Sequence, residues 1–220
     1  MQRLALILLA FALAGPLGAT AQSPDLLEMD GKTYRIHTNP LAPFLAANPG
    51  RLPKPAIIST GLWRGYIATW AVHENRLLLK DVRMLTKAAM DSKADESKRY
   101  RSVLKEMFGD GAPQPTAWFT GHLIVPMGEL VDYVHMGYGS TYSSYLVLTI
   151  VQGELRERRK LSAEAFLKFR RTQYAAYRRT PEYAKARADA TADGTKMPEA
   201  QLEDFLFQFT SEEYLSRIFR

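Results

Sequence analysis

The sequence predicts an α+β fold, in which an antiparallel β-rich sheet, sandwich or barrel with one inserted helix precedes a helical C-terminal region. Between residues 26 and 159, short apolar segments rich in Tyr, Trp, Val and Ile alternate with turn signals. From residue 161 onward the apolar spacing is helical and the chain is highly charged. Strands followed by helices are typical of α+β proteins. With 46% hydrophobic and 24% charged residues in 220, the composition is globular and excludes a disordered chain.

Residues 1–21 have the form of a secretory signal peptide. Arg3 supplies a positive charge, residues 4–14 are an unbroken apolar run, and Ala19 and Ala21 place small residues before a cleavage point at Gln22. The alternative is a membrane anchor, but this run falls short of the roughly 20 residues that span a bilayer. We therefore expect a periplasmic or secreted protein. Its predicted parts are the signal peptide, a β-rich domain and a helical extension packed on it, over residues 1–21, 22–160 and 161–220.

Turn signals predict two hairpins in the first half of the β-rich part. Residues 26–29 and 32–36 flank an Asp-Gly pair, which accommodates the positive φ angles of a two-residue turn. Residues 64–72 and 76–84 form a second pair around a short connection. The five prolines in residues 39–55 predict an irregular segment between these hairpins.

Two further strands are expected at residues 117–125 and 130–136, and a last pair within residues 145–158 around Gln152-Gly153. The inserted helix precedes them. Ser92 is its predicted N-cap and Gly109 ends it, with apolar residues between them at helical spacing.

The C-terminal part contains three predicted helix starts, each with a hydroxyl N-cap: Ser162, Thr180 and Thr210. Pro181 follows one of them at the first helical position, where its missing N–H costs nothing. Glu213 has the spacing of a capping box with Thr210. Residues 190–198 are small and polar and predict a linker.

The connection at residues 133–142 is the best candidate for a ligand-facing loop. Its candidate binding residues are Tyr133, His135, Tyr138, Ser140 and Tyr142. Glycines between them allow close backbone approach, and tyrosines offer stacking surface and hydroxyl donors to a polar ligand. The alternative is a wide connection between strands whose tyrosines cover the core.

Trp63 and Arg64 are a second candidate, because a tryptophan beside an arginine suits stacking combined with anion pairing. The alternative for Trp63, as for Trp70 and Trp118, is packing in the core.

Motifs for common chemistry are missing. The chain has no cysteine, which excludes disulfides, thiolate metal sites, cysteine nucleophiles and a lipoprotein anchor. It also lacks a zinc-protease helix, a serine nucleophile elbow and a phosphate loop. The spacing of His37, His73, His122 and His135 matches no metal site, so we expect no metal and no cofactor. His135 is a weak catalytic candidate, since imidazole titrates in the useful range and Glu129 or Asp132 would orient it.

The net charge of +6 is unevenly distributed. Residues 154–187 contain eleven Lys or Arg and four Glu, whereas residues 189–213 contain seven acids and one Lys. One interpretation is a basic helical surface that faces an anionic partner. The other is that the acidic stretch folds back and neutralises the basic one.

Three motifs resemble those of an uncharacterised bacterial protein family with no known activity: LWRGYIATW at 62–70, WFTG at 118–121 and HMGYGS at 135–140. The resemblance covers roughly residues 34–154. It implies a common fold for the β-rich part and no mechanism.

The sequence therefore predicts an exported soluble binding or interaction module, with residues 133–142 as its ligand-facing loop. Its partner would be a small polar ligand or a protein, with an anionic membrane surface as a further possibility. Nucleic acid is not expected for an exported protein, and the oligomeric state is left open. The alternatives are a hydrolase that uses His135 with a nearby carboxylate and an envelope component that contacts anionic lipid.

Overall fold

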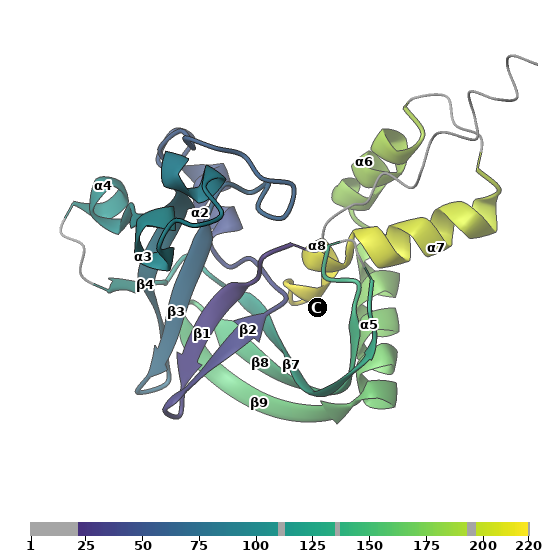
Figure 1. The fold of residues 1–220 in the computed structure, drawn as a ribbon. Coiled ribbons are helices and arrows are strands. Elements are labelled where there is room, and N and C mark those ends of the chain that lie inside the picture. Colours follow the sequence, from purple (N-terminus) through teal and green to yellow (C-terminus); the bar gives the residue numbers. More distant parts are fainter. Residues whose placement is uncertain (1–21, 110–112, 135–136, 193–196, 220) are drawn as a thin grey trace, which may run out of the picture.

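The computed structural model describes residues 22–109, 113–134, 137–192 and 197–219 (Figure 1). The α+β class is confirmed, with a nine-stranded sheet and helices concentrated toward the C-terminus. The predicted signal peptide and the weak catalytic candidate His135 lie outside the described residues. Within the described ranges, no helix is long and apolar enough to cross a membrane.

The sheet has the strand order β2-β1-β3-β4-β9-β8-β7, and β5 and β6 pair with β4. The strands are β1 (Asp25–Met29), β2 (Lys32–Ile36), β3 (Ile67–His73), β4 (Arg76–Leu85), β5 (Tyr100–Ser102), β6 (Gln114–Pro115), β7 (Gly121–Asp132), β8 (Thr141–Val151) and β9 (Glu154–Ser162). Neighbours are antiparallel except β1 and β3, which run parallel. The two ends of this order meet, since His37 N donates to Ile124 O at 2.8 Å just after β2. The sheet therefore curls into a partly closed barrel (Figure 1).

The predicted hairpins are confirmed because their turn residues adopt the required backbone. Asp30 and Gly31 both have positive φ between β1 and β2. Gln152 and Gly153 do the same between β8 and β9. A side chain at Gly153 would lie 2.9 Å from the backbone of Thr116, so this turn requires glycine for space as well.

Two predictions for the middle of the chain are wrong. The separate strands expected at 117–125 and 130–136 are one strand, β7, because the register shifts after Met127 absorb the break as a bulge. The helix expected from Ser92 to Gly109 is divided into α3 (Glu96–Arg99) and α4 (Leu104–Phe108). Between them β5 pairs with β4, and this long-range pairing overrides the local helical spacing.

Two short helices occur where none was predicted, namely α2 (Ala42–Ala47) and the 3₁₀ helix η1 (Lys87–Met90). The first begins with a proline in its first turn, which is compatible with a helix start, so the proline-rich segment is only partly irregular.

Four helices follow the sheet: α5 (Ala163–Tyr177), α6 (Pro181–Ala190), α7 (Glu199–Phe209) and α8 (Ser211–Leu215). Ser162 and Thr180 are N-caps as predicted, and their hydroxyls accept from the N–H groups of Ala165 and Tyr183. The predicted capping box at Thr210 is wrong. Because α7 ends there, the Thr210 hydroxyl instead donates to Leu206 O at 2.7 Å.

Two apolar clusters hold the molecule together. One lies inside the curved sheet around Trp70, which is 0% exposed. The other joins β7 and β8 to the helices, where the ring of Tyr145 stacks on that of Phe166 with centroids 3.6 Å apart. Trp118 packs between Phe44 and Phe108 at the margin of the first cluster.

Candidate functional site

The structure brings together two of the predicted site residues that are 74 positions apart in the chain. Arg64, just before β3, donates from one terminal nitrogen to the hydroxyl of Tyr138 at 2.6 Å. Its other terminal nitrogen donates to Ser23 O at 2.8 Å and lies 3.3 Å from Asp25 Oδ1. The guanidinium is therefore committed to internal partners, and it is not displayed to an external anion as the sequence predicted.

Asp25 at the start of β1 is fully buried and anchors this arginine. Its carboxylate also accepts from Ala68 N at 3.0 Å and from Trp70 Nε1 at 3.1 Å. Burial raises the pKa of Asp25, while the nearby Arg64 charge and these donors oppose the rise.

The contacts continue from Tyr138 to the C-terminal helices. The Tyr138 hydroxyl donates to Asn39 Oδ1 at 3.0 Å, and Asn39 Nδ2 donates to Glu212 Oε2 at 2.6 Å. We call Asp25, Arg64, Tyr138, Asn39 and Glu212 the Asp25–Glu212 chain. It links β1, the segment before β3, the β7–β8 connection, the segment after β2, and α8.

A column of aromatic rings branches from Tyr138. The ring of His37 stacks on Tyr138 with centroids 4.7 Å apart, and Tyr142 meets His37 edge-on at 5.7 Å. Tyr142 N in turn donates to the hydroxyl of Tyr145 at 2.8 Å. Burial, with Arg35 nearby, lowers the pKa of His37 to about 4, so this ring is neutral at neutral pH.

The aromatic column ends at an open groove, which we call the Tyr142 groove. It has a volume of about 340 Å³ and lies between the β7–β8 end of the sheet and the start of α5. Its walls include Val131, Tyr142, Tyr145, Phe166 and Leu167, with Glu164 among the few polar groups. Val131 is 66% exposed and Leu167 38% exposed, so large apolar side chains face solvent here.

A second pocket of about 370 Å³ is lined in part by α8 and by members of the Asp25–Glu212 chain. Asn39, Phe119, Thr120, Glu212 and Arg217 contribute to its lining. Burial raises the pKa of Glu212, and the charge of Arg64 and the Asn39 donor only partly offset the rise.

The remaining predicted site residues occupy different settings. Ser140 is tied within its own loop, where its hydroxyl accepts from Val134 N at 3.0 Å. Tyr133 is exposed directly after the end of β7. Trp63 is 72% exposed and does not join Arg64 at a common site, so the core-packing alternative for this tryptophan is wrong.

The three described histidines do not share one environment. His37 belongs to the aromatic column, whereas His73 is exposed at the end of β3. His122 is buried, with its Nδ1 3.3 Å from the Thr149 hydroxyl and Phe169 edge-on at 5.4 Å. Burial, aided by Arg159, lowers the pKa of His122 to about 4.

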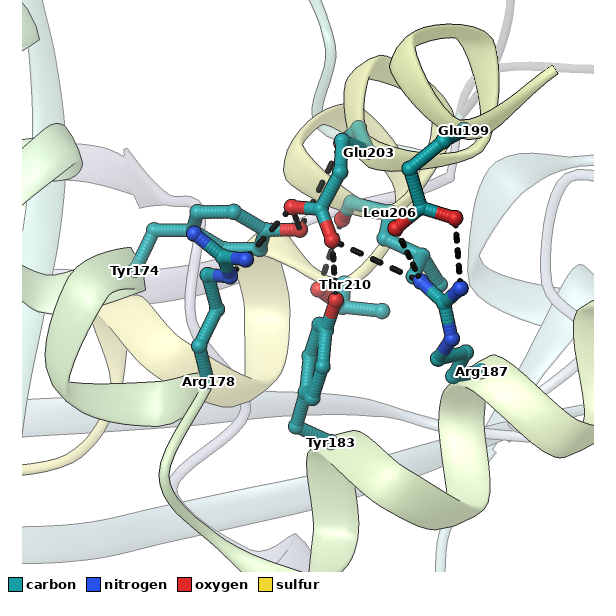
Figure 2. A network of polar contacts seen from close by, with 8 residues as sticks. All are labelled: Tyr174, Arg178, Tyr183, Arg187, Glu199, Glu203, Leu206 and Thr210. Atoms are coloured by element: carbon teal, nitrogen blue, oxygen red, sulfur yellow. Dashed lines mark hydrogen bonds and ion pairs between the residues drawn. The ribbon is translucent and has the colours of Figure 1, made fainter.

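A network of polar contacts joins α5, α6 and α7 (Figure 2). Glu203 accepts from the Tyr174 hydroxyl at 3.1 Å and from the Tyr183 hydroxyl, and it lies 3.4 Å from Arg178 and 3.6 Å from Arg187. Glu199 pairs with Arg187 at 2.6 Å. We call these six residues the Glu203 cluster. The acidic stretch therefore folds back on the basic one, as the second interpretation of the charge distribution predicted.

Sequence reasoning missed Asp25, Asn39 and Glu212. One signal was present for Asp25, because it begins the alternation Asp25, Leu27, Met29, whose members are all buried in β1. No local pattern marks Asn39 or Glu212, since they meet only across 173 positions.

Comparisons of the chain with protein-family models, with curated proteins and with solved structures gave no match. The resemblance to a bacterial family therefore stays a prediction.

Proposed function

We propose that the protein is an exported binding module that holds the apolar part of an amphipathic small molecule in the Tyr142 groove. The observation that carries the proposal is the groove itself. Its volume of about 340 Å³ falls in the usual range of ligand pockets, and its walls are mainly apolar with a few polar groups. Exposed apolar side chains gathered at one place commonly mark an interaction site.

The groove has firm walls, which favours a preformed site. Tyr145 is held between the Phe166 ring and the Tyr142 backbone N–H. Tyr142 is backed by His37, which is itself stacked on Tyr138. A rigid aromatic wall costs little conformational entropy when a ligand binds. Two charged residues line the groove. Arg170 is bonded to the Tyr214 hydroxyl, so Glu164 favours a ligand that carries a hydrogen-bond donor beside its apolar body.

Export is supported by the sequence of residues 1–21, with its charged start, apolar run and small residues before Gln22. We infer a periplasmic or secreted location from this pattern.

Titration with the neutral apolar fluorophore N-phenyl-1-naphthylamine tests the binding proposal. Leu167→Lys places a charge in the groove wall, and we expect it to weaken binding of the fluorophore at least about tenfold. Met90→Lys is the matched control, because Met90 is also a large apolar residue, 79% exposed, and lies outside the groove lining. Equal affinity of both variants and the wild-type protein would contradict the proposal.

A second candidate is contact with an anionic lipid surface. Some cations of the basic stretch have no ion pair with another described residue: Lys160, Lys168, Arg171 and Arg179. Two of them, Lys168 and Arg171, lie on α5 beside the groove residue Leu167. Co-sedimentation with phosphatidylglycerol vesicles that weakens as salt rises, and is lost in a Lys168→Glu, Arg171→Glu variant, would support it. Equal binding to phosphatidylcholine vesicles would count against it.

A further inference from the structure

The short helix α8 joins the sheet to the C-terminal helices. Ser216 O, directly after it, accepts from His122 N at 2.9 Å and so covers the outer edge of β7. A side chain at Gly121 would lie 1.9 Å from the same oxygen, so the contact is too close for any residue but glycine. On the other side, Glu213 accepts from the Tyr177 hydroxyl at 2.7 Å. Attachment of α8 therefore fixes both halves of the molecule.

Glu212 is the residue of α8 that points into the Asp25–Glu212 chain. The charged or titratable groups that act on it are Asp25 of β1, Arg64 before β3, Glu213 of its own helix, and the hydroxyls of Tyr66 and Tyr138. Arg217, just after α8, lines the same pocket but is paired with Glu182. Its hydrogen-bond donor is the neutral amide of Asn39.

The charges in this chain do not balance. Two carboxylates, Asp25 and Glu212, are served by one guanidinium, which is bonded to Asp25 and not to Glu212. The fully buried Asp25 holds the closer position. Glu212 is half-buried, and an ionised carboxylate that is partly removed from water and lacks its own cation is costly, a cost that protonation removes.

We propose that Glu212 is a protonation-dependent latch, which holds α8 against β7 and the β7–β8 connection tightly when neutral and more loosely when ionised. Burial raises the pKa of Glu212 above its ordinary 4.5. The folded state consequently binds more protons than the unfolded state above pH 4.5. The contribution of this group is complete below that pH and is lost as pH rises through the raised pKa.

Two buried histidines change the free energy of unfolding with pH in the opposite direction. Burial lowers the pKa values of His37 and His122 to about 4, so their contributions are lost as pH falls from 6.5 toward 4. The pH profile of the wild-type protein is therefore a sum, and the latch must be isolated by comparing variants at the same pH.

Amide hydrogen exchange at His122 measures the latch, because this N–H is bonded to Ser216 O. We expect wild-type and Glu212→Gln proteins to exchange at similar rates near pH 4.5. At pH 8 the wild-type protein should exchange faster, by about tenfold for each unit by which burial raises the pKa of Glu212. Amides of the β3–β4 hairpin, whose strands do not pair with β7, report global unfolding.

Asp204→Asn is the matched control, since Asp204 is an exposed acid of α7 that lies outside the Asp25–Glu212 chain. It should behave like the wild type at both pH values. If the ratio of the wild-type and Glu212→Gln exchange rates does not change with pH, or if the Asp204 variant changes in the same way as the Glu212 variant, the proposal is overturned.

Carboxyl-carbon NMR of the wild-type protein tests the latch without any substitution. A Glu212 titration midpoint above 4.5 is expected, and a midpoint at or below 4.5 would overturn the proposal even if the glutamine variant did not fold. None of these results depends on ligand binding in the Tyr142 groove.

Discussion

The Asp25–Glu212 chain and the Glu203 cluster are both polar networks that join distant segments, but they differ in charge balance and burial. In the Glu203 cluster two glutamates meet two arginines, and the arginine side chains are 37% and 53% exposed (Figure 2). In the Asp25–Glu212 chain two carboxylates share one arginine, and Asp25 is fully buried. A balanced, hydrated network holds helices together at any ordinary pH, whereas an unbalanced buried one makes the fold sensitive to protonation.

The largest expected effect comes from breaking the buried chain at its anchor. Asp25→Ala leaves Arg64 without its carboxylate and leaves Ala68 N and Trp70 Nε1 without an acceptor. We expect a loss of about 3–5 kcal/mol in the free energy of unfolding, measured by urea denaturation. The control Asp189→Ala removes an exposed ion pair with Lys185 and should cost no more than about 1 kcal/mol. Similar losses of stability for both variants would contradict the expectation that burial of the carboxylate determines the size of the loss.

The next largest effect is expected from Gly121→Ala, which disturbs the contact between β7 and α8, the helix that joins the two halves of the molecule. The added methyl group would occupy the position of Ser216 O, so α8 must shift away from β7. We expect a loss of about 3 kcal/mol or less, and faster exchange of the His122 amide. Gly31→Ala, with positive φ but nothing within 4 Å of the new group, should cost about 1 kcal/mol and leave that amide unchanged.

Lowering the pH tests the aromatic column, which lies beside the Asp25–Glu212 chain. Because the pKa of His37 is lowered to about 4 by burial, the wild-type protein should lose stability between pH 6.5 and 4, by up to about 3 kcal/mol from this group. His37→Phe retains the stack on Tyr138 and should lose less over that range in thermal unfolding. His73→Phe, at an exposed position, should keep the wild-type acid profile. If the His37 variant lost as much stability in acid as the wild-type protein, the lowered pKa of His37 would be contradicted.

The smallest effect is expected in the balanced network. Glu203→Gln keeps a side-chain acceptor for only one of the Tyr174 and Tyr183 hydroxyls, which bond different carboxylate oxygens, and it removes the charge that faces Arg178 and Arg187. We expect a loss of about 1 kcal/mol that shrinks as salt is raised, measured by urea denaturation at two ionic strengths. A larger, salt-independent loss would mean that this cluster resembles the buried chain.

Local turn and cap chemistry made much of the fold predictable. Asp30-Gly31 and Gln152-Gly153 mark hairpins because their backbone preferences act within a few residues. Ser162 and Thr180 mark helix starts for the same reason. Predictions were wrong where a distant partner decided the outcome, as for β5, which β4 draws out of a helical pattern.

The candidate site was less predictable. Arg64 and Tyr138 were identified by residue type, but their contact with each other and the roles of Asn39 and Glu212 depend on the folded chain. The prediction of an anion-binding arginine differs from the structure because the nearest anion for Arg64 is Asp25, which only the pairing of β1 with β3 brings close.

By itself, the sequence determined the α+β class, the main hairpins, two helix caps and the lack of cysteine chemistry, because each follows from residue types or short-range backbone preferences. Tertiary structure alone decided which carboxylates lie near the Arg64 guanidinium, where the apolar groove opens, and how α8 closes the edge of β7. The contacts of Asp25 with Arg64 and of Asn39 with Glu212 join residues 39 and 173 positions apart, and their energies arise only when the sheet has curled and excluded water.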